Sequence, residues 1–143
     1  MLDSKPRIIS EKIPSKLEII TQSVDSLTQK IKEFGVSEKE IFNIRLCLDE
    51  ALVNAARHGN ELNPDLFVYV HVELKGRVLT LEVKDEGQGF DFKSLPDPTK
   101  NDNILKTSGR GVYLIRKLMD EVKFFDCGRG IKMIKLLHKG GVK

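Results

Sequence analysis

The chain has 143 residues, of which 40% are hydrophobic, 31% are charged and 6% are aromatic, with a formal net charge of +3. This length fits one domain with its own core, so we expect residues 1–143 to form a single domain. The mild charge and few aromatic rings argue against a nucleic-acid-binding surface. The sequence has no apolar run long enough to span a bilayer and no signal-peptide core, so we expect a cytoplasmic protein without membrane association.

The first half of the chain reads as one strand followed by two helices. Arg7–Ile13 is short and β-like and ends at Pro14, which is typical of an edge strand or of the entry to a strand. Apolar residues at three- and four-residue intervals predict a helix that is capped by Ser15 and runs to about residue 34. Ser37 and Glu40 have the spacing of a capping box, so a second helix is expected from Glu38.

The second half reads as two hairpins separated by a long loop and a helix. Residues 86–108 show no sustained periodicity, and so long a loop inside a compact domain indicates a functional lid or disorder. The expected elements are strands 66–75 and 78–85, a helix from 109 to about 119, and strands 121–125 and 131–138. The apolar residues of the last segment also fit a helix turn.

The resulting order, β-α-α-β-β-α-β-β, predicts an α/β (α+β) two-layer sandwich, with a mixed, mostly antiparallel sheet and its helices on one face. Cys47 and Cys127 lie far apart, without paired metal-ligand spacing, so we expect both to be reduced core residues.

One polar stripe crosses the otherwise apolar end of the second helix. Glu50, Asn54 and His58 are four residues apart and therefore fall near one face of the helix. Small alanines between them would let a ligand or another backbone approach, and Gly59 is expected to end the helix as a glycine cap. The alternative is a polar stripe that simply faces water.

A strand ending in a carboxylate is followed by two glycines, Asp85-x-Gly87-x-Gly89. The glycines permit close backbone approach to a ligand. A carboxylate only accepts hydrogen bonds, so a partly buried Asp85 suits an exocyclic amino group such as that of adenine. An ordinary Asp-Glu-Gly turn is the alternative.

A glycine-containing loop, Thr107-Ser108-Gly109-Arg110-Gly111, opens the third helix. Free backbone N–H groups and the helix dipole favour an anion there, although a tight phosphate site also needs Mg²⁺ or basic side chains. The nearby candidates are Lys100, Lys106 and Arg110, which could equally be a solvated basic lid.

Together these three motifs resemble those of the Bergerat-fold ATPases, which include gyrase and the histidine kinases. Glu50-x-x-x-Asn54-Ala55-x-x-His58-Gly59 resembles the N-box, Asp85-x-Gly87-x-Gly89-Phe90 the first glycine box, and Gly109-Arg110-Gly111-Val112 the second. The short chain and the segment 118–122 are similar to the bacterial anti-sigma factor serine kinases.

The resemblance implies an ATP-binding site that uses Mg²⁺. Asn54 would be the magnesium ligand, and Glu50 would be the general base that accepts a proton from a serine hydroxyl of a partner protein. The residues expected to bind ATP are Asn54, Asp85, Gly87, Gly89, Lys106, Thr107, Ser108, Gly109, Arg110 and Gly111. We interpret His58 as structural.

The resemblance also implies an anti-sigma-factor antagonist and a sigma factor as partners, and it allows a homodimer. Two positions depart from the family pattern. Thr107 stands where some of these kinases have an arginine, and Ile131 stands where a threonine often follows the last hairpin turn. The leading hypothesis is therefore an ATP-dependent serine kinase that acts as an anti-sigma factor, and the alternative is a nucleotide-binding switch without kinase activity.

Overall fold

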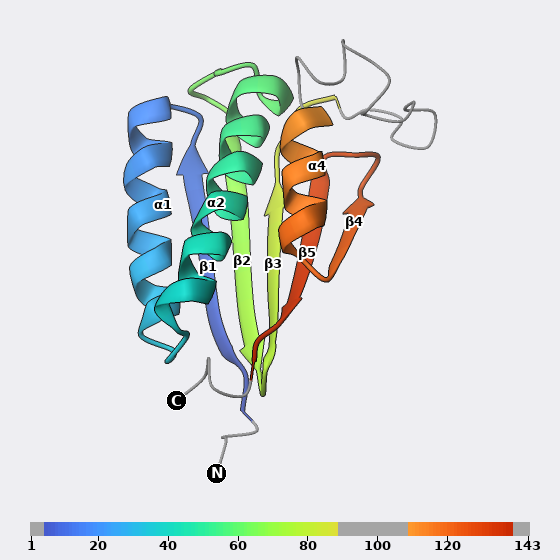
Figure 1. Ribbon diagram of the computed structural model, residues 1–143. Helices are drawn as coiled ribbons and strands as arrows, with labels where there is room; N and C mark the ends of the chain where they lie inside the picture. The colour runs from blue at the N-terminus through green and yellow to red at the C-terminus, as the bar shows by residue number, and fades with distance from the viewer. Residues whose placement is uncertain (1–4, 89–108, 139–143) are drawn as a thin grey trace.

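The computed structural model describes residues 5–88 and 109–138, which form two layers (Figure 1). One layer is a five-stranded sheet in the order β1-β2-β3-β5-β4, and every pairing within it is antiparallel. The other layer consists of helices that cover one face of the sheet (Figure 1). The elements are β1 Arg7–Pro14, α1 Leu17–Lys32, α2 Glu38–Asn54, η1 Ala55–Gly59, β2 Phe67–Lys75, β3 Val78–Lys84, α4 Gly109–Leu118, β4 Glu121–Phe125 and β5 Gly130–Leu136. The predicted two-layer α/β sandwich with helices on one face is confirmed, and β1 is an edge strand. The sheet formed by the described strands is antiparallel throughout, so the predicted mixed sheet is wrong in that respect.

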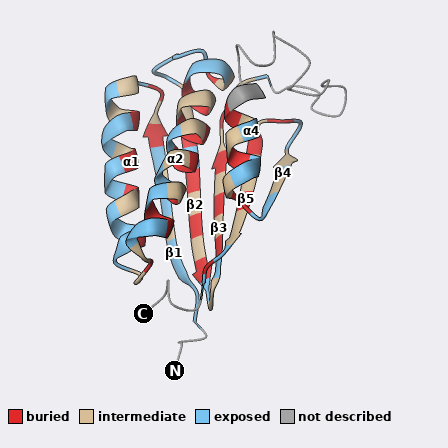
Figure 2. Ribbon diagram, in the orientation of Figure 1, coloured by how far each residue is buried: buried red, intermediate tan, exposed pale blue. Residues whose placement is uncertain are grey.

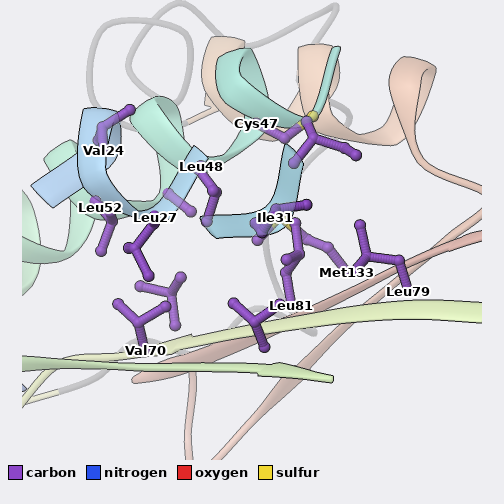
Figure 3. Packing of buried hydrophobic residues seen from close by; sticks show 14 of the residues in the cluster. Val24, Leu27, Ile31, Cys47, Leu48, Leu52, Val70, Leu79, Leu81 and Met133 are labelled. Atoms are coloured by element: carbon purple, nitrogen blue, oxygen red, sulfur yellow. The ribbon is translucent and has the colours of Figure 1, made fainter. Parts of the chain in front are cut away.

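The core lies between the two layers. Alternate residues of the strands face the helices and are buried, whereas the outer faces of the helices are exposed (Figure 2). Figure 3 shows Val24 and Leu27 of α1 and Leu48 of α2 packed above Val70 and Leu81 of the sheet. A fully buried Leu, Ile or Val side chain contributes about 1.5–3 kcal/mol through burial. This packing fixes α2 over the middle of the sheet, and α2 carries the polar stripe.

The start of α2 follows the sequence prediction in part. Ser37 is the N-cap, and its Oγ accepts a hydrogen bond from the Glu40 backbone N–H at 3.3 Å. The buried Glu40 carboxylate accepts instead from the backbone N–H of His138, at 3.3 and 3.4 Å. The side chain of Glu40 therefore ties the end of the sheet to the start of α2.

The predicted cap of α1 is wrong. The N-cap residue is Lys16, which makes no side-chain capping bond. Ser15 is buried, and its hydroxyl donates to the carbonyl of Leu66 at 2.8 Å. The Ser15 hydroxyl therefore makes a long-range hydrogen bond instead of the helix-capping bond that the sequence predicted.

The end of α2 also differs from the prediction. The helix passes without a break into the single π-helical turn η1, where each hydrogen bond spans one residue more than in an α-helix. Gly59 lies within this turn and is not a left-handed glycine cap, because it is not among the residues with positive φ. The wider turn shifts the helical register after Asn54, and His58 is exposed.

The two cysteines are both free, but only Cys47 belongs to the core. Cys127 is exposed in the β4–β5 turn, so its predicted burial is wrong. Burial raises the pKa of the Cys47 thiol to about 11, partly offset by the charge of Lys135. Among the described residues, no helix is long and apolar enough to cross a membrane.

Candidate nucleotide-binding site

Three segments that are distant in sequence meet at one end of the molecule. The C-terminal end of α2, the C-terminal end of β3 and the N-terminal end of α4 all lie at the same end of the two layers (Figure 1). These segments contain the three sequence motifs.

The carboxylate and amide of the polar stripe face the start of α4. Glu50 and Asn54 are half-buried on α2, and the backbone of Gly111 packs against both side chains. A Cβ added to Gly111 would overlap the Glu50 carboxylate and would lie 2.9 Å from the Asn54 Nδ2 atom. Glycine therefore lets the backbone approach without displacing Glu50, and the helix N-terminus lies beside a carboxylate and an amide.

Packing and a C-terminal contact hold α4 in this position. Ile115 and Met119 are buried against the core, while Tyr113 on the opposite side is exposed. The Lys135 Nζ atom donates to the carbonyl of Leu118 at 3.0 Å, where a cation is favourable near the last turn of the helix. The N-terminal end of α4 is thereby directed toward Glu50 and Asn54.

Asp85 follows β3 directly and is 8% exposed. Its Oδ1 accepts a hydrogen bond from the backbone N–H of Gly87 at 2.8 Å. Gly59 of η1 lies directly against this carboxylate, and Gly87 lies against the carbonyl of Gly59. An added side chain at either glycine would overlap these groups, so both glycines are needed for the close contact between η1 and the end of β3.

Burial raises the pKa of the Asp85 carboxyl above its usual value. The Gly87 N–H and the positive charge of Arg129 act in the opposite direction and favour the ionised form. A carboxylate can accept several hydrogen bonds, so a largely buried Asp85 that accepts one from Gly87 is well suited to accept another from a ligand.

Sequence reasoning did not identify Asn60, whose side chain is 2% exposed. Its Nδ2 donates to the Ser15 hydroxyl at 2.9 Å and to the carbonyl of Phe67 at 3.0 Å, and its Oδ1 accepts from the Glu86 N–H at 2.8 Å. The amide thus joins the end of η1 to the segment that follows Asp85. An asparagine directly after the N-box was the only sequence signal for this role.

The described residues fit a magnesium nucleotide. In residues 5–88 and 109–138, no group of three His, Cys, Asp or Glu side chains could hold a metal ion. Magnesium bound with a nucleotide needs only one or two protein ligands, because water and phosphate oxygens supply the rest. Asn54 carries an amide oxygen, which is a ligand type that magnesium accepts. The Asn54 amide lies beside Gly111 at the start of α4, and backbone N–H groups at a helix N-terminus favour a phosphate.

Several predicted site residues lie outside the described residues, namely Gly89, Lys106, Thr107 and Ser108, together with most of the predicted lid at 86–108. Gly109 and Arg110 begin α4, but the side chain of Arg110 also lies outside the described part of the structure. Of the predicted residues, the structure brings Glu50, Asn54 and Gly111 together, and it places Asp85 and Gly87 against Gly59.

The chain is similar to known proteins over nearly its whole length. The family model for the histidine kinase-like ATPase domain matches residues 13–137. The chain is also similar to the serine-protein kinase RsbW of Staphylococcus aureus strains MSSA476 and MW2, with 26% identity over 150 residues, covering 99% of this chain and 94% of each relative. The RsbW of strain JH9 is 25% identical over the same coverage. The chain belongs to the histidine kinase-like ATPase domain family.

Proposed function

We propose that the protein is an ATP-dependent serine protein kinase that acts as an anti-sigma factor. It phosphorylates a small anti-sigma-factor antagonist and sequesters a sigma factor in a partner switch. The observation that carries this proposal is the packing of the Gly111 backbone against the Glu50 carboxylate and the Asn54 amide. Family membership and the name of the S. aureus relatives support it.

In this proposal, two groups of residues bind ATP at its two ends. Asp85 accepts a hydrogen bond from the adenine amino group, while Gly87 and Gly89 shape the pocket around the base. The segment from Lys106 to Gly111 binds the phosphates through backbone N–H groups at the start of α4 and through the charges of Lys106 and Arg110. Burial of Asp85 and its contact with η1 support the first assignment.

Glu50 and Asn54 have separate roles in the proposed transfer. Asn54 holds Mg²⁺ through its amide oxygen, and Glu50 accepts the proton of the serine hydroxyl on the antagonist. Bound ATP supplies the phosphoryl group. Such transfer depends mainly on alignment and on neutralisation of charge. The packing of Gly111 against Glu50 and Asn54 supports this proposed alignment.

We further propose that residues 1–143 form a single ATPase domain, located in the cytoplasm, that can form a homodimer. Its partners are the antagonist and the sigma factor, with no role for nucleic acid or a membrane. The match of the family model over residues 13–137 supports the single domain, and the mild net charge of +3 supports partners that are proteins.

A nucleotide-binding switch without kinase activity is the second candidate. Thr107 stands where some related kinases have an arginine, and this departure favours binding without transfer. Loss of an arginine that stabilises transition-state charge reduces phosphoryl transfer more than it reduces nucleotide binding.

Transfer of labelled phosphate from Mg·ATP to each candidate antagonist tests the two functions. The informative pair is Glu50→Gln and Asp49→Asn, because Asp49 is an exposed carboxylate on the same helix and serves as a matched control. We expect Glu50→Gln to abolish transfer while retaining ATP binding, and Asp49→Asn to behave as the wild type. Undiminished transfer by Glu50→Gln would refute the assignment of the base. Firm ATP binding without transfer to any candidate would favour the switch.

A further inference from the structure

The turn between β4 and β5 contacts the segment that carries Asp85. The backbone N–H of Asp85 donates to the carbonyl of Arg129 at 3.0 Å, which continues the β3–β5 pairing one residue past the end of each strand. The Arg129 Nε atom donates to the carbonyl of Gly87 at 2.7 Å. One residue therefore contacts the backbone on both sides of Glu86.

The Arg129 side chain is itself held in place. It is 32% exposed, and its guanidinium lies 3.5 Å from the Asp126 carboxylate, which also pairs with the Lys84 Nζ atom at 2.8 Å. Asp126 and Cys127 have positive φ values of 52° and 55°, so the turn has a defined and unusual backbone. Arg129 and Asp85 both line an open cavity of about 440 Å³ at this end of the sheet.

We propose that Arg129 is a positioning residue of the nucleotide-base site, fixing residues 85–87 so that the Asp85 carboxylate is presented to the base. This inference rests on the proposed role of Asp85 in binding adenine. Asn60 holds the same segment from the opposite side through the Glu86 N–H. The segment is thus fixed between η1 and the β4–β5 turn before any ligand arrives.

The guanidinium also acts on the charge of Asp85. The charged groups that face this carboxylate are Arg129 and Lys84, which favour ionisation, and Asp126, which opposes it. Burial already raises the pKa of Asp85, so loss of the Arg129 charge would raise it further. A protonated Asp85 would accept the adenine amino group less well.

Two substitutions separate these effects. Arg129→Lys keeps the positive charge but lacks the Nε–H that reaches the Gly87 carbonyl, whereas Arg129→Gln removes both. Any residue at position 129 keeps the backbone bond to Asp85. Arg45→Gln is the matched control, because it removes an exposed arginine that pairs with Asp25 between α1 and α2.

The experiment measures Mg·ATP affinity by calorimetry across a range of pH, together with hydrogen exchange of the Gly87 amide in the nucleotide-free protein. We expect both Arg129 variants to bind Mg·ATP about tenfold more weakly, as for loss of one charge-assisted hydrogen bond. Gly87 should exchange faster in both. The affinity for Mg·ATP should fall at low pH, where Asp85 becomes protonated. This fall should occur at a higher pH in Arg129→Gln than in the wild type, and at the wild-type pH in Arg129→Lys. A general loss of stability would not produce this difference.

The inference would be overturned if Arg129→Gln had the same Mg·ATP affinity and the same Gly87 exchange rate as the wild type. It would also be overturned if Arg45→Gln lost as much Mg·ATP affinity as the Arg129 variants. A different result marks failure of the proposed function, namely a wild-type protein that does not bind Mg·ATP. If the wild type does not bind Mg·ATP, hydrogen exchange of the Gly87 amide still shows whether Arg129 fixes residues 85–87. Equal exchange rates in the wild type and Arg129→Gln would overturn the inference without any measurement of nucleotide binding.

Discussion

Gly111→Ala separates the stability of the fold from the function of the site. The added Cβ would overlap the Glu50 carboxylate and crowd the Asn54 amide. The overlapping atoms belong to the far end of a flexible side chain, so Glu50 can rotate away at a cost of about 0.5–1.5 kcal/mol. Alanine in place of glycine within a helix stabilises by up to about 1 kcal/mol. The two terms nearly cancel.

The free energy of unfolding of Gly111→Ala should therefore stay within about 1 kcal/mol of the wild type, which corresponds to a change in Tm of at most about 4 °C. Function should respond far more strongly. A displacement of about 1 Å at a reacting group can lower the rate about 100-fold. We expect a loss of that order in phosphoryl transfer, with weaker Mg·ATP binding because Asn54 is also displaced.

Thermal unfolding, calorimetry with Mg·ATP and a transfer assay together check this prediction. Gly76→Ala provides the control, because Gly76 has φ of 61° in the β2–β3 turn and nothing lies near its Cβ position. That variant should lose about 1–2 kcal/mol of stability, owing to the left-handed backbone, and keep full nucleotide binding. The reasoning is refuted if Gly111→Ala binds and transfers like the wild type, or if it is destabilised more than Gly76→Ala.

Three further predictions concern buried polar groups. Because the pKa of Asp85 is raised in the folded state, its stabilising contribution is complete below the ordinary value of 3.8 and is lost as the pH rises through the folded value. Urea unfolding should thus show the stability of Asp85→Asn rising relative to the wild type between pH 3.5 and 7, and a constant difference would contradict this. Asn60→Ala removes three hydrogen bonds made by a buried side chain and should lower the free energy of unfolding in chemical denaturation by about 2–4 kcal/mol. A loss below about 1 kcal/mol would contradict the importance of these bonds. Cys47 is buried and its pKa is about 11, so it should resist thiol reagents at pH 8 until the protein unfolds. The exposed Cys127 should react at once. Equal reaction rates for the two thiols would show that Cys47 is accessible.

Local sequence was sufficient wherever the determining interactions are local. Alternation of apolar residues predicted strands β2 and β3, and the Ser37–Glu40 spacing predicted the start of α2 at Glu38. Strand β4 occupies its predicted residues, Glu121–Phe125. Helical spacing also placed Glu50 and Asn54 on one face, where Gly111 now contacts both.

Long-range contacts account for what the sequence could not predict. Ser15 was assigned to a helix cap, but its hydroxyl bonds to Leu66 and to Asn60, which is 45 residues away. Gly59 was expected to cap a helix, but it allows close contact with Asp85 from within a π-helical turn. Arg129 gave no signal, because its bond to Gly87 depends on the pairing of β3 with β5. Each of these roles depends on a partner supplied by the tertiary fold.

Calorimetric titration of Mg·ATP into the wild type and Asp85→Asn is the most direct test of the proposed nucleotide site. We expect the wild type to bind, and the variant to bind at least tenfold more weakly, because an amide in place of the carboxylate presents donors as well as an acceptor to the adenine amino group. The Tm of each protein, measured in the same buffer, confirms that both are folded. Equal binding by the two proteins would contradict the assignment of Asp85, and no binding by the wild type would contradict the nucleotide site as a whole.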